Sequence, residues 1–164
     1  MKMYFKQSLF HLFDTFDVYD EYEQRLYHVK GKFSLGTLLK IYDADDTEIG
    51  TVKEQVFSFL SKYDLYEKSY YLGQLRQNFA FFRKKYQFDY YGWQVEGDFP
   101  GWNYHIVDQS GELIAQVRKE FFRVSEHYVL DVPEPENALA VLMFTLAIVV
   151  DKQGNTNAAV LSSS

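Results

Sequence analysis

The stretch LAVLMFTLAIVV, residues 139–150, is the most apolar part of the chain and decides its fold. Thr145 is its one polar member, so a helix formed by these residues has no polar face. A helix that is apolar on every side must be surrounded on every side. A membrane-spanning helix needs about 20 such residues, and a run of this length is more typical of a buried core helix.

The residues on either side of this run favour a helix over about 134–152. The preceding PEPEN, residues 133–137, supplies proline and two carboxylates suited to the positive end of a helix dipole. Lys152 suits the negative end, and Gly154 is a residue type that commonly ends a helix. We therefore expect a core helix here, with a membrane anchor as the alternative.

A short pattern recurs before this helix at steps of 20–24 residues: an apolar residue followed, in five of six copies, by Lys or Arg. The copies begin at Phe5, Val29, Val52, Leu75, Val95 and Val117. A second pattern lies between them, with an aromatic residue or Leu, an apolar residue two positions on, and then an acidic residue. Its copies begin at Phe16, Leu39, Tyr63, Tyr86, Tyr104 and Tyr128. Both patterns alternate with period two, which is typical of half-buried strands.

Twelve strands joined by short turns are expected to close into a barrel, because an open sheet leaves aggregation-prone edges. With strands about 4.8 Å apart and tilted by about 40°, twelve give a radius of roughly 12 Å. That radius leaves an axial hole for one α-helix, whose diameter is about 10–12 Å. The sequence therefore predicts a mostly β fold: a closed antiparallel barrel of about twelve strands around a central hydrophobic C-terminal α-helix.

The chain of 164 residues is long enough for one domain with a sizeable core. We expect a single barrel domain over residues 1–153 and a flexible, small and polar tail over 154–164. The absence of cysteine excludes disulfides and thiol metal sites. The N-terminus lacks the pattern of a signal peptide, which favours a cytoplasmic location, with peripheral contact at a membrane left open.

Charge is expected to separate between the two ends of the barrel. The net charge of −6 disfavours a nucleic-acid partner. The turns that follow the second pattern hold eleven carboxylates and two basic residues, whereas the opposite turns hold six basic residues and one carboxylate. The helix should start at the acidic end and run toward the basic end, which suits its dipole at both termini.

The basic end supplies the candidate binding site. Its densest cluster is FFRKKY, residues 81–86, which we expect in a loop beside aromatic side chains. Together with cations of neighbouring turns it suits an anionic headgroup or phosphate. A solvated, purely solubilising surface is the alternative. The candidate site residues are Lys32, Lys62, Arg83, Lys84, Lys85 and Arg123.

Other motifs favour structural roles. DADDTE, residues 43–48, has carboxylates spaced like the start of a calcium loop, but Glu48 stands where that loop needs glycine, so a hairpin turn is the better interpretation. Trp93 and Trp102 are expected to pack internally, with ligand stacking as the alternative. We expect no metal site and no cofactor, because the four histidines lack metal-ligand spacing and no phosphate loop occurs.

Several stretches together resemble the bacterial members of the LURP-one-related family, which belongs with tubby C-terminal domains and phospholipid scramblases. These stretches are MYFKQ, YHVKGKFSLGTLLKIYD, GTVKEQVFSFLSKYDLY, GWQVEGDFPGWNYHI and the terminal YVLDV with ALAVLMFTLAIVVD. They cover about residues 1–152. The resemblance implies a closed barrel around a central helix, in agreement with the strand count.

For function, the resemblance implies a binding module rather than an enzyme. Tubby domains are associated with phosphoinositide binding through basic residues, scramblases with calcium-linked lipid movement, and plant relatives with defence. The segment before the terminal helix here reads DVPEPEN, without the Asp-x-Asp spacing of the scramblase calcium site. We expect a non-enzymatic module for an anionic phospholipid or a protein partner. A scramblase-like protein whose terminal helix inserts into the membrane, and an enzyme of unknown reaction, are the alternatives.

Overall fold

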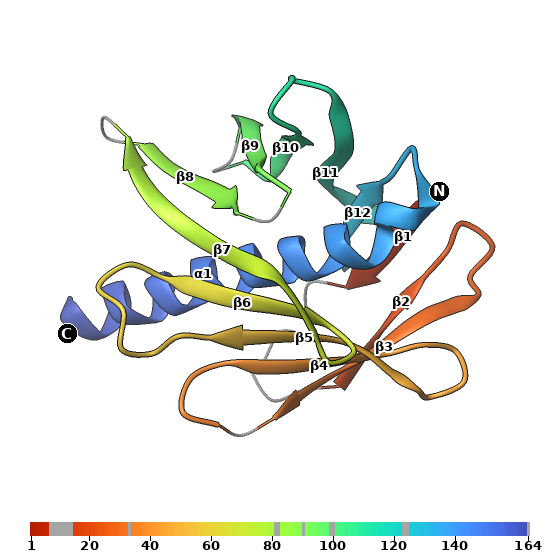
Figure 1. The fold of residues 1–164 in the computed structure, drawn as a ribbon, viewed down its shortest axis with the longest axis horizontal. Coiled ribbons are helices and arrows are strands. Elements are labelled where there is room, and N and C mark those ends of the chain that lie inside the picture. The colour runs from red at the N-terminus through yellow and green to blue at the C-terminus, as the bar shows by residue number, and fades with distance from the viewer. Residues whose placement is uncertain are drawn as a thin grey trace.

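The computed structural model describes residues 1–6, 15–32, 34–80, 83–89, 91–98, 101–122 and 125–163; the side chains of 78–80, 83–85, 122, 125–126 and 155–161 are not described. Twelve strands precede one short 3-10 helix and one long α-helix (Figure 1). They are β1 (Lys2–Lys6), β2 (Thr15–Tyr19), β3 (Arg25–Lys32), β4 (Leu38–Tyr42), β5 (Glu48–Glu54), β6 (Lys62–Glu67), β7 (Tyr70–Ala80), β8 (Arg83–Phe88), β9 (Trp93–Asp98), β10 (Asn103–Val107), β11 (Leu113–Phe122), β12 (Ser125–Asp131), η2 (Pro135–Asn137) and α1 (Ala138–Ser162). Each odd-numbered strand contains one copy of the first sequence pattern, and each even-numbered strand contains one copy of the second. The predicted count of about twelve strands is therefore confirmed.

The strands form a closed antiparallel barrel in which each strand pairs with its neighbours in sequence. The first and last strands complete the circle, with Met3 opposite Leu130 and Phe5 opposite Tyr128. The N-terminal amino group continues this closure by donating a hydrogen bond of 2.7 Å to the carbonyl oxygen of Val132. The predicted fold class is therefore confirmed.

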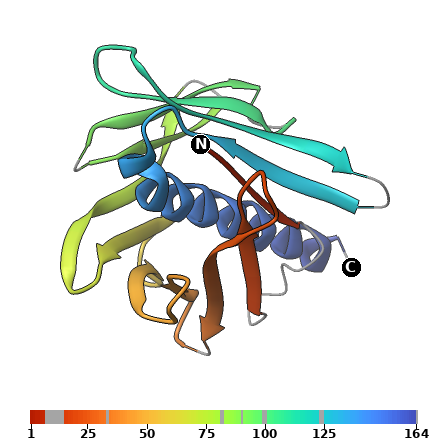
Figure 2. The ribbon, with the colours of Figure 1, turned by 90° about the vertical axis from the view of Figure 1, so that its right-hand side faces the viewer.

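The helix α1 fills the barrel axis, as Figures 1 and 2 show from two perpendicular directions. All nine residues from Val141 to Val149 are 0% exposed, and nine residues make more than two helical turns. Every face of this helical segment is therefore covered by the barrel wall. One segment among the described residues, Pro135–Gly154, has the length and composition of a membrane span, and 72% of its most apolar window is buried within the barrel.

The helix runs from the acidic end of the barrel to the basic end, as the sequence predicts. Near its start it approaches β5 so closely that a Cβ atom at Gly50 would lie 3.2 Å from Leu139 Cδ1 and from Met143 Sδ. Near residue 151 it reaches the opposite end, where Asp151 contacts Tyr86 of β8. A glycine at position 50 thus lets the helix pass close to the wall.

The acidic turns owe their shape to three aspartates in equivalent positions. Asp43 Oδ1 accepts hydrogen bonds from the backbone N–H groups of Asp45 and Thr47, at 3.0 and 2.9 Å. Asp20 and Asp108 make the corresponding pairs of bonds in their own turns. DADDTE is therefore a hairpin turn, because its first carboxylate satisfies backbone donors that would otherwise face solvent.

Two details of the sequence prediction are wrong. The helix does not end near 152 but continues to Ser162, because no proline follows and Ala158, Ala159 and Leu161 favour helix enough to tolerate Gly154. Residues 154–162 thus belong to α1, and whether this segment is flexible stays a prediction. The basic cluster does not lie wholly in a loop, because residues 83–86 pair with 77–80 as part of β8 and β7.

We predict that removing residues 133–164 abolishes soluble expression. The deletion exposes the apolar inner face of twelve strands and leaves an axial hole that their side chains are too short to fill. Soluble yield and circular dichroism of the truncated chain would check this. A folded, monomeric barrel without the helix would contradict the assignment of α1 as the core.

Candidate functional site

The barrel interior holds few polar groups among the described residues, and one of them is a buried carboxylate at the basic end of α1. Asp151 accepts hydrogen bonds from the Tyr86 hydroxyl and, at 3.4 Å, from Gln77 Nε2. Burial, followed by the charge of Asp151, raises the pKa of both Tyr63 and Tyr86. This cluster fixes the position of α1 along the barrel axis, because the residues around Asp151 come from three different strands, β6, β7 and β8.

Two further polar contacts fix the helix. Thr145, the single polar residue of the apolar run, is fully buried near the Tyr104 hydroxyl, whose pKa is raised by burial. Lys152 places its Nζ 3.7 Å from the centroid of the Trp102 ring, a cation–π contact at the mouth of the barrel. These contacts orient the helix and leave its apolar faces to the barrel wall.

Both tryptophans pack against other aromatic rings, and only Trp93 is buried. Trp93 is buried, with its ring centroid 6.0 Å from that of Phe88 and 6.2 Å from that of Phe144. Trp102 lies edge-on to Tyr128, with ring centroids 4.8 Å apart. Internal packing is thereby confirmed for Trp93, whereas Trp102 is half-buried and its predicted role stays a prediction.

Exposed apolar side chains gather at the basic end, on the two loops β3–β4 and β5–β6. Phe57 and Phe59 are 98% and 101% exposed, and Leu35 is 81% exposed. The two loops touch, because a Cβ atom at Gly36 would lie only 2.3 Å from Val56 Cγ1. We call Leu35, Val56, Phe57 and Phe59 the loop-tip patch. Single exposed apolar residues are ordinary, but several neighbouring ones suggest a contact surface.

Two cations of the candidate site lie at the strand ends that these two loops join. Lys32 is exposed at the end of β3, and Lys62 is half-buried at the start of β6, so each begins or ends a strand beside one of the two loops. Residues Arg83, Lys84 and Lys85 open β8 at the same barrel end, but their side chains are not described. Arg123 lies outside the described residues. The structure thus brings Lys32 and Lys62 next to apolar loops and leaves the candidate binding role as a prediction.

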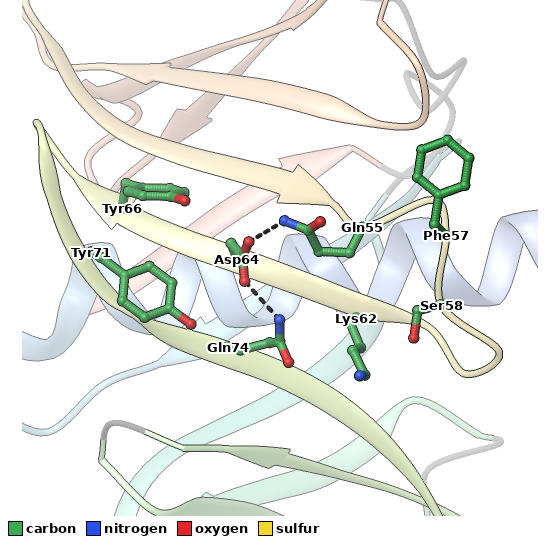
Figure 3. A pocket seen from close by; sticks show the side chains of 8 residues that line it. All are labelled: Gln55, Phe57, Ser58, Lys62, Asp64, Tyr66, Tyr71 and Gln74. Carbon is green, nitrogen blue, oxygen red and sulfur yellow. Dashed lines mark hydrogen bonds between the residues drawn. The ribbon is translucent and has the colours of Figure 1, made fainter.

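A groove of about 530 Å³ opens on the outer wall across β5, β6 and β7 (Figure 3). It is lined by Gln55, Phe57, Ser58, Lys62, Asp64, Tyr66, Tyr71 and Gln74. Asp64 lies at its centre and is only 8% exposed, although it points away from the barrel axis. Its carboxylate accepts a hydrogen bond from Gln55 Nε2 and another of 2.8 Å from Gln74 Nε2.

The negative charge of Asp64 acts on two tyrosines at one side of the groove. The rings of Tyr66 and Tyr71 lie with centroids 5.4 Å apart and planes inclined by 59°. Burial first, and then the Asp64 carboxylate, raise the pKa of both hydroxyls. Lys62 lies on the other side of Asp64, toward Ser58 and Phe57.

The sequence offered a weak signal for the loop-tip patch and almost none for the groove. FSFL, residues 57–60, stands between two strands where polar turn residues are usual, so its apolar character was the available clue. Asp64 stands at an outward position between Tyr63 and Leu65, where a solvated carboxylate is the ordinary expectation. Its burial depends on Gln55 and Gln74 from neighbouring strands, which period-two alternation does not reveal.

The fold is a twelve-stranded antiparallel barrel closed around its own C-terminal helix. A family model for LURP-one-related proteins matches residues 1–151, and the chain belongs to that family. The chain is 25% identical over 153 residues to the uncharacterized protein YxjI of Bacillus subtilis (strain 168), covering 92% of each chain. An X-ray structure of an Arabidopsis thaliana protein has the same fold, with a TM-score of 0.60 and 15% identity over 93% of this chain and 90% of the other.

We predict alkaline unfolding caused by the core tyrosines. Burial raises the pKa of Tyr63, Tyr86 and Tyr104 above the ordinary value of 10.0. A raised pKa in the folded state stabilises the fold below the unfolded pKa, and this contribution is lost as pH rises past it. The free energy of unfolding should therefore fall steeply above about pH 10.

Phenolate absorbance and circular dichroism, recorded together during an alkaline titration, would check this prediction. The phenolate signal of Tyr63, Tyr86 and Tyr104 should appear only as the structure is lost. Ionisation of all 14 tyrosines in one step near pH 10, with the spectrum of the folded state retained, would contradict it.

Proposed function

We propose that this protein is a non-enzymatic binding module whose basic end docks on an anionic lipid surface from the cytoplasmic side. The observation that carries the proposal is the loop-tip patch, with fully exposed Phe57 and Phe59 on the loop that leads to Lys62, and with Lys32 at the strand end before the adjoining loop. Aromatic side chains at loop tips suit the apolar boundary of a bilayer, and flanking lysines suit its anionic headgroups. Each lysine near such a surface contributes about 1 kcal/mol.

The occupied barrel axis supports a binding module over an enzyme. A substrate site is usually a deep, mostly apolar cavity, and the side chains of α1 fill the place where a barrel of this size would hold one. The sites that remain for a ligand are the outer wall and the barrel ends. The burial of α1 also speaks against the alternative in which this helix leaves the barrel to enter a bilayer, because departure would expose the inner face of every strand.

We predict charge-dependent binding to vesicles. In a flotation assay, retention should increase when phosphatidylglycerol is added to phosphatidylcholine vesicles, and it should fall at high salt. The double variant Phe57→Ser with Phe59→Ser should lose most retention. The variant Lys32→Glu should bind the anionic vesicles about 10-fold more weakly, because it reverses one charge at the surface.

The matched control is Lys68→Glu, which makes the same charge change on an exposed residue of the acidic end. It should bind like the unmodified protein. Equal retention of Lys32→Glu and Lys68→Glu, or no retention on either lipid composition, would contradict the proposal and favour a protein partner.

A further inference from the structure

The groove on the outer wall contains two opposite charges, Asp64 and Lys62, that lack an oppositely charged partner in the described part of the chain. Among the described residues, neither Asp64 nor Lys62 forms an ion pair within 4.0 Å. The groups around the Asp64 carboxylate are neutral: the amides of Gln55 and Gln74 donate hydrogen bonds to it, and the Tyr71 hydroxyl lies near it. A buried carboxylate with neutral partners gains from an added cation, because burial weakens its solvation by water.

The two tyrosines determine what kind of cation fits beside Asp64. The inclined rings of Tyr66 and Tyr71 lie beside Asp64, with the Tyr71 hydroxyl directed toward its carboxylate, and Tyr71 is 54% exposed, so its ring is accessible. Aromatic faces beside an acidic group attract organic ammonium ions, whose charge is spread over bulky, weakly hydrated groups. A small metal ion is less suited, because the carboxylate oxygens already accept hydrogen bonds and no further carboxylate lines the groove.

Lys62 provides an anion subsite next to the cation subsite. It precedes Asp64 by two residues on β6, so both side chains leave the same face of the strand about 7 Å apart. Figure 3 shows the order along the groove: the two tyrosines, Asp64, Lys62, then Ser58 and Phe57. An ammonium ion at the first part and a phosphate at Lys62 and Ser58 would therefore match the groove in both charge and order.

We infer that this groove binds a phosphorylated amino alcohol, a zwitterion of the phosphocholine or phosphoethanolamine type. Its ammonium group contacts Asp64, Tyr66 and Tyr71, and its phosphate contacts Lys62 and Ser58. This orientation directs the phosphate ester toward Phe57 and the loop-tip patch, as a phospholipid bound from a membrane surface requires. A free phosphoamino alcohol carries the same ammonium and phosphate groups and would bind in the same way. Only the inference that the ligand is a lipid headgroup rests on the function proposed above.

A titration followed by nuclear magnetic resonance tests the inference without a membrane. The side-chain amide signals of Gln55 and Gln74 report on the carboxylate that they contact. Phosphocholine should shift these signals saturably, whereas choline alone and inorganic phosphate alone should each bind at least about tenfold more weakly. Equal affinity for choline and phosphocholine would overturn the anion subsite, and no saturable shift with phosphocholine would overturn the site.

Matched variants separate binding from folding. Asp64→Asn should weaken phosphocholine binding at least about tenfold, and Tyr71→Ala, at an exposed ring, should weaken it by a similar factor. The control Asp45→Asn removes the same charge from an exposed turn at the opposite end and should bind normally. If Asp64→Asn fails to fold, Tyr71→Ala decides: phosphocholine affinity equal to that of Asp45→Asn would overturn the inference.

Vesicles of phosphatidylcholine identify the source of the ligand. Loss of vesicle retention in Asp64→Asn, together with loss of phosphocholine binding, supports a lipid headgroup. Saturable phosphocholine binding without vesicle retention supports a free phosphoamino alcohol. In the second case the groove assignment stands, and the lipid-docking function is decided separately by the anionic vesicles, so failure of one is distinguishable from failure of the other.

Discussion

The enclosure of one apolar helix by the barrel wall is the constraint on which the structure depends. Residues Val141 to Val149 have no accessible surface, and each large apolar side chain among them contributes about 1.5–3 kcal/mol by leaving water. The barrel needs the helix equally, because twelve strands enclose a hole that their own side chains do not fill. Neither part is expected to be stable alone, so strand closure and helix burial form one cooperative unit.

This constraint places the candidate sites on the outside of the barrel. The alternation that directs Tyr63 and Leu65 toward the helix directs Lys62, Asp64 and Tyr66 to the outer wall. The loops at the two ends of the barrel also lie outside the core, and they differ from each other. At the acidic end, aspartates accept hydrogen bonds from the backbone of their own turns. At the basic end, the loop-tip patch has fully exposed aromatic residues. The surfaces available to a ligand are therefore the groove on the outer wall and the apolar, basic end of the barrel.

The sequence predicts features that depend on local alternation, and it misses features that depend on neighbouring strands. All twelve strands follow from period two, and the core helix follows from an apolar run with no polar face. The continuation of α1 past Gly154 was missed, since one glycine is a weak stop without a following proline. Lys32 and Lys62 were found from charge, but the groove was not, because the burial of Asp64 requires Gln55 and Gln74 brought from separate strands.

The central claim is tested most directly by the accessibility of a single cysteine, since the chain has none of its own. Ala147→Cys would lie in the middle of the enclosed helix, and Ala44→Cys would make the same change in an exposed acidic turn. We predict that maleimide labels the variant at 44 rapidly and the variant at 147 only when the protein unfolds, with or without anionic vesicles. Rapid labelling at 147 in the folded protein would contradict the enclosed helix.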